Sequence, residues 1–503
     1  MRVTFIASEC EPWAKTGGLA DVVDALARAL GRQPAAAVEA PVDVYLPRYR
    51  SVPVPEGATA TTLRVPDPTA LTGTTEVTIL DVAGDGYRVR LVDHPPAFDR
   101  DGFYGDAAGD YPDNAWRFGL FCRAALEAIR ADGRGTDVLS LHDWHAAPAV
   151  IFRDRWYADD PVIGRAAVVM TLHNLAYHGW VPRERLRELG LAAGDPMLVD
   201  DAGLDLLRAG IDRAELANTV SPGYAAEALT PDYGMGLDGS LRAKGDRFFG
   251  ILNGLDTALW DPATDRDIAA TYSRADRRGK ATCRRELLAE LGLDADDPSP
   301  VIGMIGRLDP QKGFDLLAGA APSLVADARL VVLGSGDPKL VGSLRDVAAR
   351  HPDRVSLLER FDRDLARRIY AGIDLFVMPS RFEPCGQGQM IALRYGAPPI
   401  VRRTGGLRDT VLDEIERPGR GTGFVFDDAT PDALLAACRA AIETFTAGGA
   451  AWSSLLDRGM AVDFDWTTGS APKYVHAYRR AAAIRADAPR ADATARARRP
   501  ATA

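Results

Sequence analysis

Short apolar segments recur along the chain, and each ends in polar or glycine-rich residues. The first, at residues 3–7, is followed by a glycine turn at 15–19 and a helical pattern at 20–30. A strand, a glycine turn and a helix in this order are typical of a βαβ unit. Parallel strands bring their carboxyl ends to one edge of a sheet, so the polar residues after them are expected to gather there. The first half has three more such segments, at 138–139, 167–170 and 216–220.

The same alternation restarts near residue 300. Its apolar segments lie at 301–305, 330–333, 375–378 and 399–401. The repetition predicts a second doubly wound parallel sheet, so the fold class is α/β with two Rossmann-like domains. A chain of 503 residues is also too long for one ordinary hydrophobic core. The expected hinge lies at 245–256.

One short motif occurs in both halves. Residues 15–23 match residues 403–411 at six of nine positions, with Lys-Thr-Gly-Gly-Leu in one copy and Arg-Thr-Gly-Gly-Leu in the other. Glycines let a phosphate approach the backbone, and a helix N-terminus favours negative charge. Two such turns predict a diphosphate held by both halves. The alternative is a chance match in a Gly-rich chain.

Composition excludes several classes of protein. The net charge of −10 argues against nucleic acid as the main partner, because there is no surplus of Lys and Arg for phosphates. The sequence has no run of about 18 apolar residues, so no membrane span is expected. Five cysteines without a C-x-x-C pair favour a reduced, cytoplasmic protein, and the N-terminal segment is too short for a signal peptide. The Ala-, Arg- and Pro-rich residues 479–503 predict a disordered tail.

Two cations lie five residues apart in the loop after the segment at 301–305. Arg307 can grip two phosphate oxygens, and Lys312 supplies a compact charge. A nucleoside diphosphate leaving group needs such compensation, because negative charge grows on it as its bond to the sugar breaks. The alternative is a solvated basic loop, but the position after a buried strand favours phosphate binding.

A carboxylate follows the segment at 375–378. Glu383 lies in Ser-Arg-Phe-Glu-Pro-Cys-Gly, at 380–386, just before a predicted helix. A carboxylate there can stabilise an oxocarbenium-like centre or orient a sugar hydroxyl. The alternative is a helix N-terminal carboxylate that accepts from free N–H groups.

Histidine-containing motifs follow two strands of the first half, at 142–145 and 173–174. Asp143 and His173 can hydrogen-bond sugar hydroxyls, and Trp144 offers an apolar face to a glucose ring. Two histidines three residues apart can suggest zinc, but no third ligand cluster accompanies them, so no metal is expected. His145 and His178 are interpreted as structural. The D-x-D pattern at 463–465 is interpreted as a surface turn.

These motifs occur in the same order in a known family. The chain resembles bacterial glycogen synthases and plant starch synthases from residue 1 to about 480. The segments that carry the resemblance are 15–19, 142–145, 173–174, 219–222, 253–256, 306–313, 380–386 and 403–407. The resemblance implies a GT-B fold, with two Rossmann-like domains facing a central cleft. Its implied parts are 1–248 on the acceptor side, 249–462 on the donor side, a segment at 463–483 that returns to the first domain, and a disordered tail at 484–503.

The resemblance also implies roles for particular residues. The implied catalytic residues are Lys15, Asp143, His173 and Glu383. The implied donor-binding residues are Lys15, Gly18, Arg307, Lys312, Phe361, Cys385, Gly386, Thr404, Gly405 and Gly406. The implied acceptor-binding residues are Tyr104, Asp113, Asn114 and Trp144. No metal and no cofactor is implied.

The implied reaction transfers glucose from ADP-glucose to the 4-hydroxyl of an α-1,4-glucan with retention of configuration. The acceptor attacks from the face that the leaving phosphate departs, and that phosphate takes the proton. UDP-glucose, another acceptor, or a catalytically weak glucan-binding homologue are the alternatives. Oligomeric state and regulation have no signal in the sequence. Gln387 and Gly388 depart from the family's usual Leu and small polar residue, which puts donor affinity in question. Phe361 replaces the more common Tyr.

Other enzyme classes fit less well. An NAD-dependent oxidoreductase should show G-x-G-x-x-G in its first βα turn, and this chain has Lys-Thr-Gly-Gly there. A glucan phosphorylase shares the GT-B fold but needs a lysine Schiff base to pyridoxal phosphate, which its absorbance would reveal.

Overall fold

The computed structural model describes residues 1–192 and 203–488. The chain forms two compact units. The first contains Met1–Asn218, Met235–Phe248 and the C-terminal stretch that begins at Ala471; the second contains Thr219–Gly234 and Phe249–Ser470.

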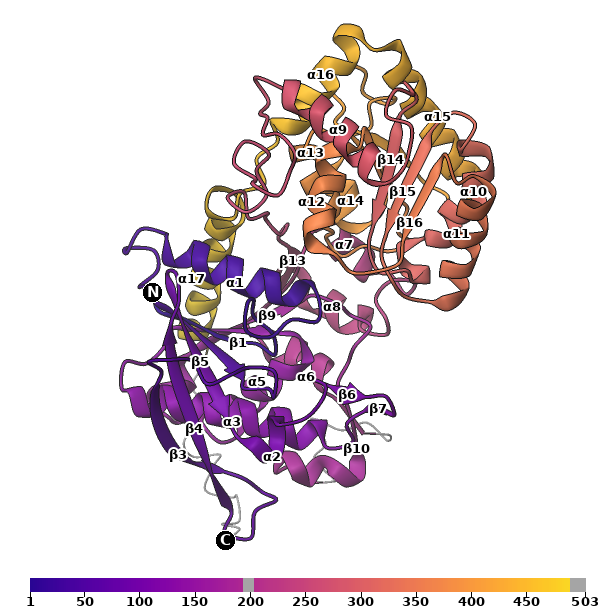
Figure 1. The fold of residues 1–503 in the computed structure, drawn as a ribbon. Coiled ribbons are helices and arrows are strands. Elements are labelled where there is room, and N and C mark those ends of the chain that lie inside the picture. Colours follow the sequence, from indigo (N-terminus) through magenta and orange to yellow (C-terminus); the bar gives the residue numbers. More distant parts are fainter. Residues whose placement is uncertain (193–202, 489–503) are drawn as a thin grey trace. The chain divides into compact units, whose positions relative to one another are not determined.

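The first unit, drawn in Figure 1, is built on one sheet of nine strands. Their order is β13-β12-β9-β8-β1-β2-β5-β4-β3. From β9 to β5 the neighbours are parallel, whereas β3, β4 and β5 pair antiparallel. The strands are β1 (Val3–Ile6), β2 (Val42–Pro47), β3 (Thr59–Pro66), β4 (Thr74–Ala83), β5 (Tyr87–Asp93), β8 (Val138–His142), β9 (Ala167–Leu172), β12 (Leu216–Thr219) and β13 (Phe248–Gly250). Two short antiparallel pairs stand apart, β6 (Gly105–Asp106) with β7 (Gly109–Asp110) and β10 (Trp180–Pro182) with β11 (Gly203–Asp205).

Helices of the first unit cover this sheet. The longer ones are α1 (Gly18–Gly31), α3 (Asn114–Asp132), α5 (Pro148–Arg155), α6 (Leu206–Arg213) and α17 (Ala471–Asp487); the short ones are α2 (Pro95–Phe98), α4 (Asp143–Ala146) and α8 (Asp238–Lys244). Helix α17 packs against β8, β9 and α1, and it buries Tyr474 and Tyr478 completely. One of the helices that cover the first sheet therefore comes from the C-terminal part of the chain.

Helix α17 is longer than the sequence pattern predicts. The tail expected at 484–503 begins inside this helix, which continues to Asp487. Ala and Arg have high helix propensity, and Arg485 donates to the carbonyl of Gly164 at 2.6 Å. The remaining residues of the expected tail, 489–503, lie outside the described part of the chain.

The second unit has a six-stranded parallel sheet in the order β16-β15-β14-β17-β18-β19. The strands are β14 (Val301–Ile305), β15 (Arg329–Leu333), β16 (Val355–Leu358), β17 (Leu375–Met378), β18 (Pro399–Arg402) and β19 (Phe424–Phe426). The helices around them are α7 (Pro222–Ala228), α9 (Arg278–Glu290), α10 (Phe314–Leu324), α11 (Pro338–Arg350), α12 (Arg363–Gly372), α13 (Gly388–Arg394), α14 (Gly405–Thr410), α15 (Pro431–Ala447) and α16 (Gly449–Met460).

Both faces of the second sheet are apolar, as a doubly wound sheet requires. Ile302 and Met304 of β14 belong to one buried cluster, and Val301 belongs to another. On β17, Leu375 and Phe376 divide between the same two clusters. The predicted strands of both halves are confirmed, whereas the antiparallel β3–β4 extension was not predicted, because half of its side chains face solvent and give no apolar run.

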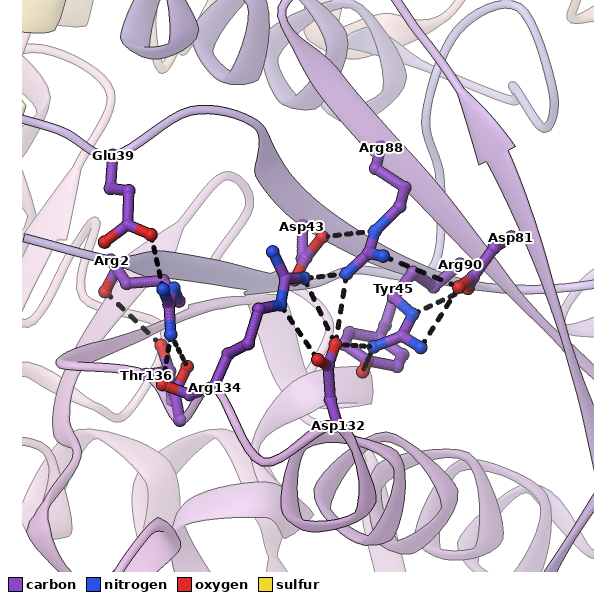
Figure 2. A network of polar contacts seen from close by, with 11 residues as sticks. Arg2, Glu39, Asp43, Tyr45, Asp81, Arg88, Arg90, Asp132, Arg134 and Thr136 are labelled. Carbon is purple, nitrogen blue, oxygen red and sulfur yellow. Dashed lines mark hydrogen bonds and ion pairs between the residues drawn. The ribbon is translucent and has the colours of Figure 1, made fainter. Parts of the chain in front are cut away.

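An ion-pair network lies at the amino ends of the parallel strands of the first sheet, opposite the carboxyl edge (Figure 2). Arg88 donates to Asp43 at 2.7 Å, and Arg90 donates to Asp132 at 3.0 Å. Arg134 donates to Asp132 at 2.8 Å, and this contact lowers the pKa of the Asp132 carboxyl to about 2. With Arg2, Glu39 and Asp81, the labelled network has four arginines and four carboxylates, so it offers no net charge to a ligand. The contacts of Asp132 tie α3 to strand β5.

Candidate active site

The glycine turn of the first unit is held by a buried carboxylate. Glu9, 3% exposed, accepts from the backbone N–H and hydroxyl of Thr16, both at 2.6 Å, and from the N–H of Gly17 at 3.2 Å. The turn leads directly into α1, whose N-terminus favours negative charge. Glu9 follows β1 by three residues and was not predicted as a site residue from the sequence.

Lys15 and Gly18 lie on this turn, as predicted. The Nζ of Lys15 is 2.6 Å from Asp21 and 3.5 Å from Glu11, and its side chain is 39% exposed. A Cβ atom added at Gly17 or Gly18 would meet no other atom within 4 Å. The space beside both glycines is therefore open, so a ligand can approach the backbone there.

The predicted acceptor residues form a linked cluster in the first unit. The Tyr104 hydroxyl donates to Glu9 at 2.6 Å, and burial raises its pKa well above the usual value. The amide of Asn114 donates to the Tyr104 carbonyl at 2.8 Å. Asp113, next to Asn114, accepts two hydrogen bonds from Arg100 at 2.8 and 2.6 Å. Tyr104 therefore joins the predicted acceptor side to the glycine turn.

Asp143 begins α4 directly after β8 and has a left-handed backbone, with φ at 57°. This conformation is uncommon outside glycine and is often found at functional sites. Its carboxylate accepts from the backbone N–H of His173 at 2.7 Å and fixes the position of that residue. Burial raises the pKa of the Asp143 carboxyl to about 7.

Asp143→Asn is expected to make the melting temperature less dependent on pH. An acid whose pKa is raised in the folded state loses stability as pH rises, here from about pH 4, its unfolded value, to about pH 7. Asn keeps the acceptor for His173 and tolerates a left-handed backbone. The variant should match wild type near pH 4 and exceed it at pH 8, by roughly 4 kcal/mol as an upper limit. Thermal unfolding across this range measures the difference, and a constant difference would contradict it.

His173 lies at the end of β9, beside His142 of β8. The Nδ1 of His142 is 3.0 Å from the Nε2 of His173. Burial lowers the pKa of the His173 imidazole to about 3. The ring is therefore neutral near neutral pH. It can donate or accept a hydrogen bond, but it is not protonated to the imidazolium form.

Trp144 and His145 are packed into an aromatic cluster. Trp144 is 8% exposed, and its ring lies 5.1 Å from that of Phe118. The His145 ring lies 4.5 Å from that of Tyr104, tilted by 31°, and its buried Nδ1 has no hydrogen-bond partner within the described residues. His145 was expected to be a structural histidine with its hydrogen bonds satisfied. Its role is structural packing, but the ring is held by aromatic neighbours and one of its nitrogens has no hydrogen bond. His178 instead pairs with Asp205 at 2.6 Å, which raises its pKa.

In the second unit, Glu383 lies in the segment after β17 and is 5% exposed. Its Oε2 is 2.7 Å from the Nζ of Lys312 and accepts from the Ser380 hydroxyl at 3.0 Å. Gly313 makes this approach feasible, since its φ is +74° and a Cβ there would lie 2.3 Å from the Pro379 carbonyl. The predicted catalytic carboxylate and the predicted phosphate-binding lysine are thus one ion pair.

Two predicted donor-binding residues project from the second unit. The Arg307 side chain is 68% exposed and pairs with Asp309 at 2.7 Å. Phe361 is 89% exposed. Because both side chains are largely exposed, both are accessible to a ligand.

The glycine turn of the second unit repeats the arrangement of the first. Glu227 of α7 accepts from the Thr404 hydroxyl at 3.1 Å and from the N–H of Gly405 at 2.8 Å. The N–H of Gly406 donates to the Glu383 carbonyl at 3.0 Å. The internal match at 15–23 and 403–411 therefore has a structural counterpart, a carboxylate that binds each Thr-Gly turn. Two N–H groups expected to cradle a diphosphate are already engaged within the unit.

The loop after Glu383 is held by a buried glutamine. The side-chain amide of Gln389 donates to the carbonyls of Cys385 at 3.1 Å and Gly386 at 3.3 Å. Cys385 is buried, and this raises the pKa of its thiol to about 12. Within the described residues, the backbone N–H groups of Gln387 and Gly388 make no hydrogen bond, as expected at the first turn of α13. These N–H groups remain open to an anion.

The chain matches two families of glycosyltransferase. Residues 2–243 match starch synthase catalytic domains, and residues 299–444 match glycosyl transferases group 1. Glycogen synthase from Geotalea daltonii is 40% identical, over 95% of this chain and 98% of its own length. Glycogen synthase from Anaeromyxobacter dehalogenans is 43% identical, over 95% and 99%. The chain belongs to the glycogen and starch synthase family.

Solved structures agree with this membership of the glycogen and starch synthase family. The catalytic domain of Starch Synthase IV from Arabidopsis thaliana, bound to ADP and acarbose, is 33% identical, with a TM-score of 0.86 over 96% of this chain and 99% of that one. Sucrose-phosphate synthase from Thermosynechococcus elongatus, 19% identical with a TM-score of 0.59 over 95% and 98%, shares the fold. The chain is a glucan-synthesising glycosyltransferase with the GT-B fold.

Gln387 and Gly388, where this chain differs from the pattern expected for the family, lie in a closely packed loop. A Cβ at Gly388 would lie 3.0 Å from the Phe376 ring and 3.1 Å from the Tyr370 hydroxyl. A side chain at position 388 would therefore press on these two aromatics, which occupy the space beside the glycine.

Residues 1–192 and 203–488 hold no group of three or more His, Cys, Asp or Glu side chains suited to a metal ion. The carboxylates of the D-x-D pattern are engaged locally, because Asp463 accepts from the N–H of Asp465, and Asp465 accepts from Thr257. No described helix is long and apolar enough to cross a membrane.

Proposed function

We propose that this synthase transfers glucose from ADP-glucose to the non-reducing 4-hydroxyl of an α-1,4-glucan with retention of configuration. Curated relatives over its full length are glycogen synthases. Starch Synthase IV from Arabidopsis thaliana was solved with ADP and acarbose. This supports an adenine nucleotide as the donor's leaving group. The pair of Glu383 and Lys312 is the observation that carries the proposal.

The donor diphosphate would be held by the cations and open N–H groups of the site. In the second unit, Lys312 supplies charge and Arg307 can grip two phosphate oxygens. In the first unit, taken by itself, the partly exposed Lys15 supplies charge and Gly18 lets a phosphate approach closely. The open backbone N–H groups of Gln387 and Gly388, in the loop after Glu383, add to these contacts. Thr404, Gly405 and Gly406 would then contribute chiefly by holding this loop, because two of their N–H groups are engaged.

Diphosphate binding would change the environment of Glu383. The phosphate competes for Lys312, whose only carboxylate partner within the described residues is Glu383. Release from the lysine leaves the carboxylate to stabilise the positive charge that develops on the sugar. Ser380 keeps the carboxylate in place, and Cys385 is buried two residues further along the chain.

The remaining roles follow from the first unit. Asp143 positions His173, and the neutral imidazole would hydrogen-bond the transferred glucose. Tyr104, Asp113, Asn114 and Trp144 would form the acceptor side. No side chain is needed as the base, since the leaving phosphate takes the proton of the attacking hydroxyl.

Incorporation of labelled glucose into glycogen, from ADP-glucose and UDP-glucose in parallel, tests this function. We expect incorporation from ADP-glucose, α-1,4 linkages in the product, and loss of both in Glu383→Ala. Faster incorporation from UDP-glucose would assign the other donor. A folded protein that binds glycogen without incorporation from either donor would be a weak glucan-binding homologue.

Phe361→Ala is expected to raise KM for ADP-glucose about tenfold with kcat little changed, because stacking of an aromatic on a base contributes about 1–3 kcal/mol. Phe361 is 89% exposed, so the melting temperature should not change. Phe361→Tyr serves as the control and should retain the wild-type KM. Equal KM values for wild type and Phe361→Ala would exclude nucleobase stacking at this position.

A further inference from the structure

A buried hydrogen-bond chain in the first unit connects α17 to His173. The Tyr478 hydroxyl lies 3.0 Å from the Ser140 hydroxyl, which lies 3.3 Å from the Nε2 of His142. The Nδ1 of His142 is 3.0 Å from the Nε2 of His173. Tyr478, Ser140 and His142 are each 0% exposed. This chain of hydrogen bonds thus runs through the core of the first unit and ends at the His173 imidazole, which is proposed to contact glucose.

The proton positions along this chain follow from the available acceptors. Within the described residues, the Tyr478 hydroxyl has only the Ser140 hydroxyl as a hydrogen-bond partner, and the Ser140 hydroxyl has only Tyr478 and His142. If Ser140 donated to Tyr478, the phenolic proton would be buried without an acceptor, which is unfavourable. Tyr478 therefore donates to Ser140, and Ser140 donates to the Nε2 of His142.

This direction determines the tautomers of both histidines. His142 must carry its proton on Nδ1 and donate it to the Nε2 of His173. Burial lowers the pKa of both imidazoles, so each ring holds one proton. His173 consequently carries its proton on Nδ1. That atom makes no hydrogen bond with another described residue.

We propose that Ser140 and His142 are positioning residues that fix His173 as the Nδ1–H tautomer, so that it presents a hydrogen-bond donor to an oxygen of the transferred sugar. The opposite tautomer would present a lone pair at the same place and could not donate to a ring oxygen. The proposal rests on the proposed role of His173 in glucose binding.

Long-range proton–nitrogen NMR spectra of the full chain, with ¹⁵N-labelled histidine, test the tautomers without an activity assay. The chain has 7 histidines, and His142→Gln and His173→Gln variants assign the two signals. We expect Nδ1–H for both residues in the wild-type protein. A proton on Nε2 of either residue overturns the proposal, whatever the enzyme's activity.

Ser140→Ala removes the donor to His142 and is compared with Thr171→Val. Thr171 is equally buried on the neighbouring strand. Its hydroxyl donates to Asn218 at 3.0 Å and is not part of the hydrogen-bond chain from Tyr478 to His173. We expect Ser140→Ala to mix the tautomers and to lower kcat about tenfold with little change in KM, and Thr171→Val to do neither. Unchanged tautomers in Ser140→Ala, or an equal loss of kcat in both variants, overturns the proposal.

Two outcomes separate this inference from the proposed function. If Ser140→Ala does not fold, the wild-type spectrum still decides the tautomers. If the wild-type tautomers are as expected but His173→Ala retains full activity, the role of His173 in glucose binding is wrong. In that case the positioning role of Ser140 and His142 is also wrong, because it depends on the role of His173.

Discussion

Glu383→Gln is expected to lower the rate of glucosyl transfer on the order of 10³-fold, with the fold retained. Glutamine keeps the shape of the side chain and an acceptor for the Ser380 hydroxyl, but it removes the charge that faces the developing positive centre. Lys312 is partly exposed and can be hydrated after the loss of its partner, so the stability change should be small. Glucose incorporation at saturating donor measures the rate, and thermal unfolding measures the fold.

Asp315→Asn is a matched control for this variant. Asp315 pairs with Arg381 at 2.7 Å, so its replacement removes a carboxylate that contacts the same 380–386 segment. Both side chains are more than one third exposed, and such pairs contribute about 0–1 kcal/mol. Its activity should therefore stay close to wild type. Comparable losses in both variants would mean that Glu383 acts only by holding the loop.

Gly405→Ala is expected to destabilise the second unit by about 3–5 kcal/mol and to abolish most activity. Gly405 has φ at +42°, and an added Cβ would lie 2.0 Å from the Glu383 carbonyl. The backbone that carries Glu383 must then move, since neither group is the end of a flexible side chain. Chemical unfolding and glucose incorporation measure the two effects.

Gly17→Ala, at the equivalent position of the other Thr-Gly turn, is the control. Its φ of −156° suits alanine, and an added Cβ meets no atom within 4 Å. Stability should change by less than about 0.5 kcal/mol. A loss of activity without a loss of stability would then report a ligand that approaches this backbone. Equal destabilisation by the two variants would contradict the difference that the structure shows between the turns.

The sequence pattern was informative where the signal is local. Apolar runs predicted the parallel strands, and the polar residues after them include Asp143, His173 and Glu383. The glycine turns were also found, because a short motif is repeated. The chemistry assigned to these residues stays a prediction until it is measured.

The partners that hold these residues could not be predicted. Glu227 binds a turn 177 residues further along the chain, and Ser140 contacts a tyrosine 338 residues away. No spacing or periodicity links such positions, and a buried Glu or Ser has no distinctive local pattern. For the same reason the sequence did not reveal that the Trp144 ring packs against Phe118.

The position of α17 has a consequence for how the protein is made. The first unit needs Tyr474 and Tyr478, which pair with Asn218 and Ser140, yet about 220 residues separate Phe248 from Ala471. At roughly 5–20 residues per second, a ribosome needs tens of seconds to add them. The nascent sheet must wait over this interval with the face of β8 and β9 uncovered, while the second unit is complete in the chain before the first. A chain that ends before Ala471 would contain the whole second unit but would lack the helix that packs against β8 and β9.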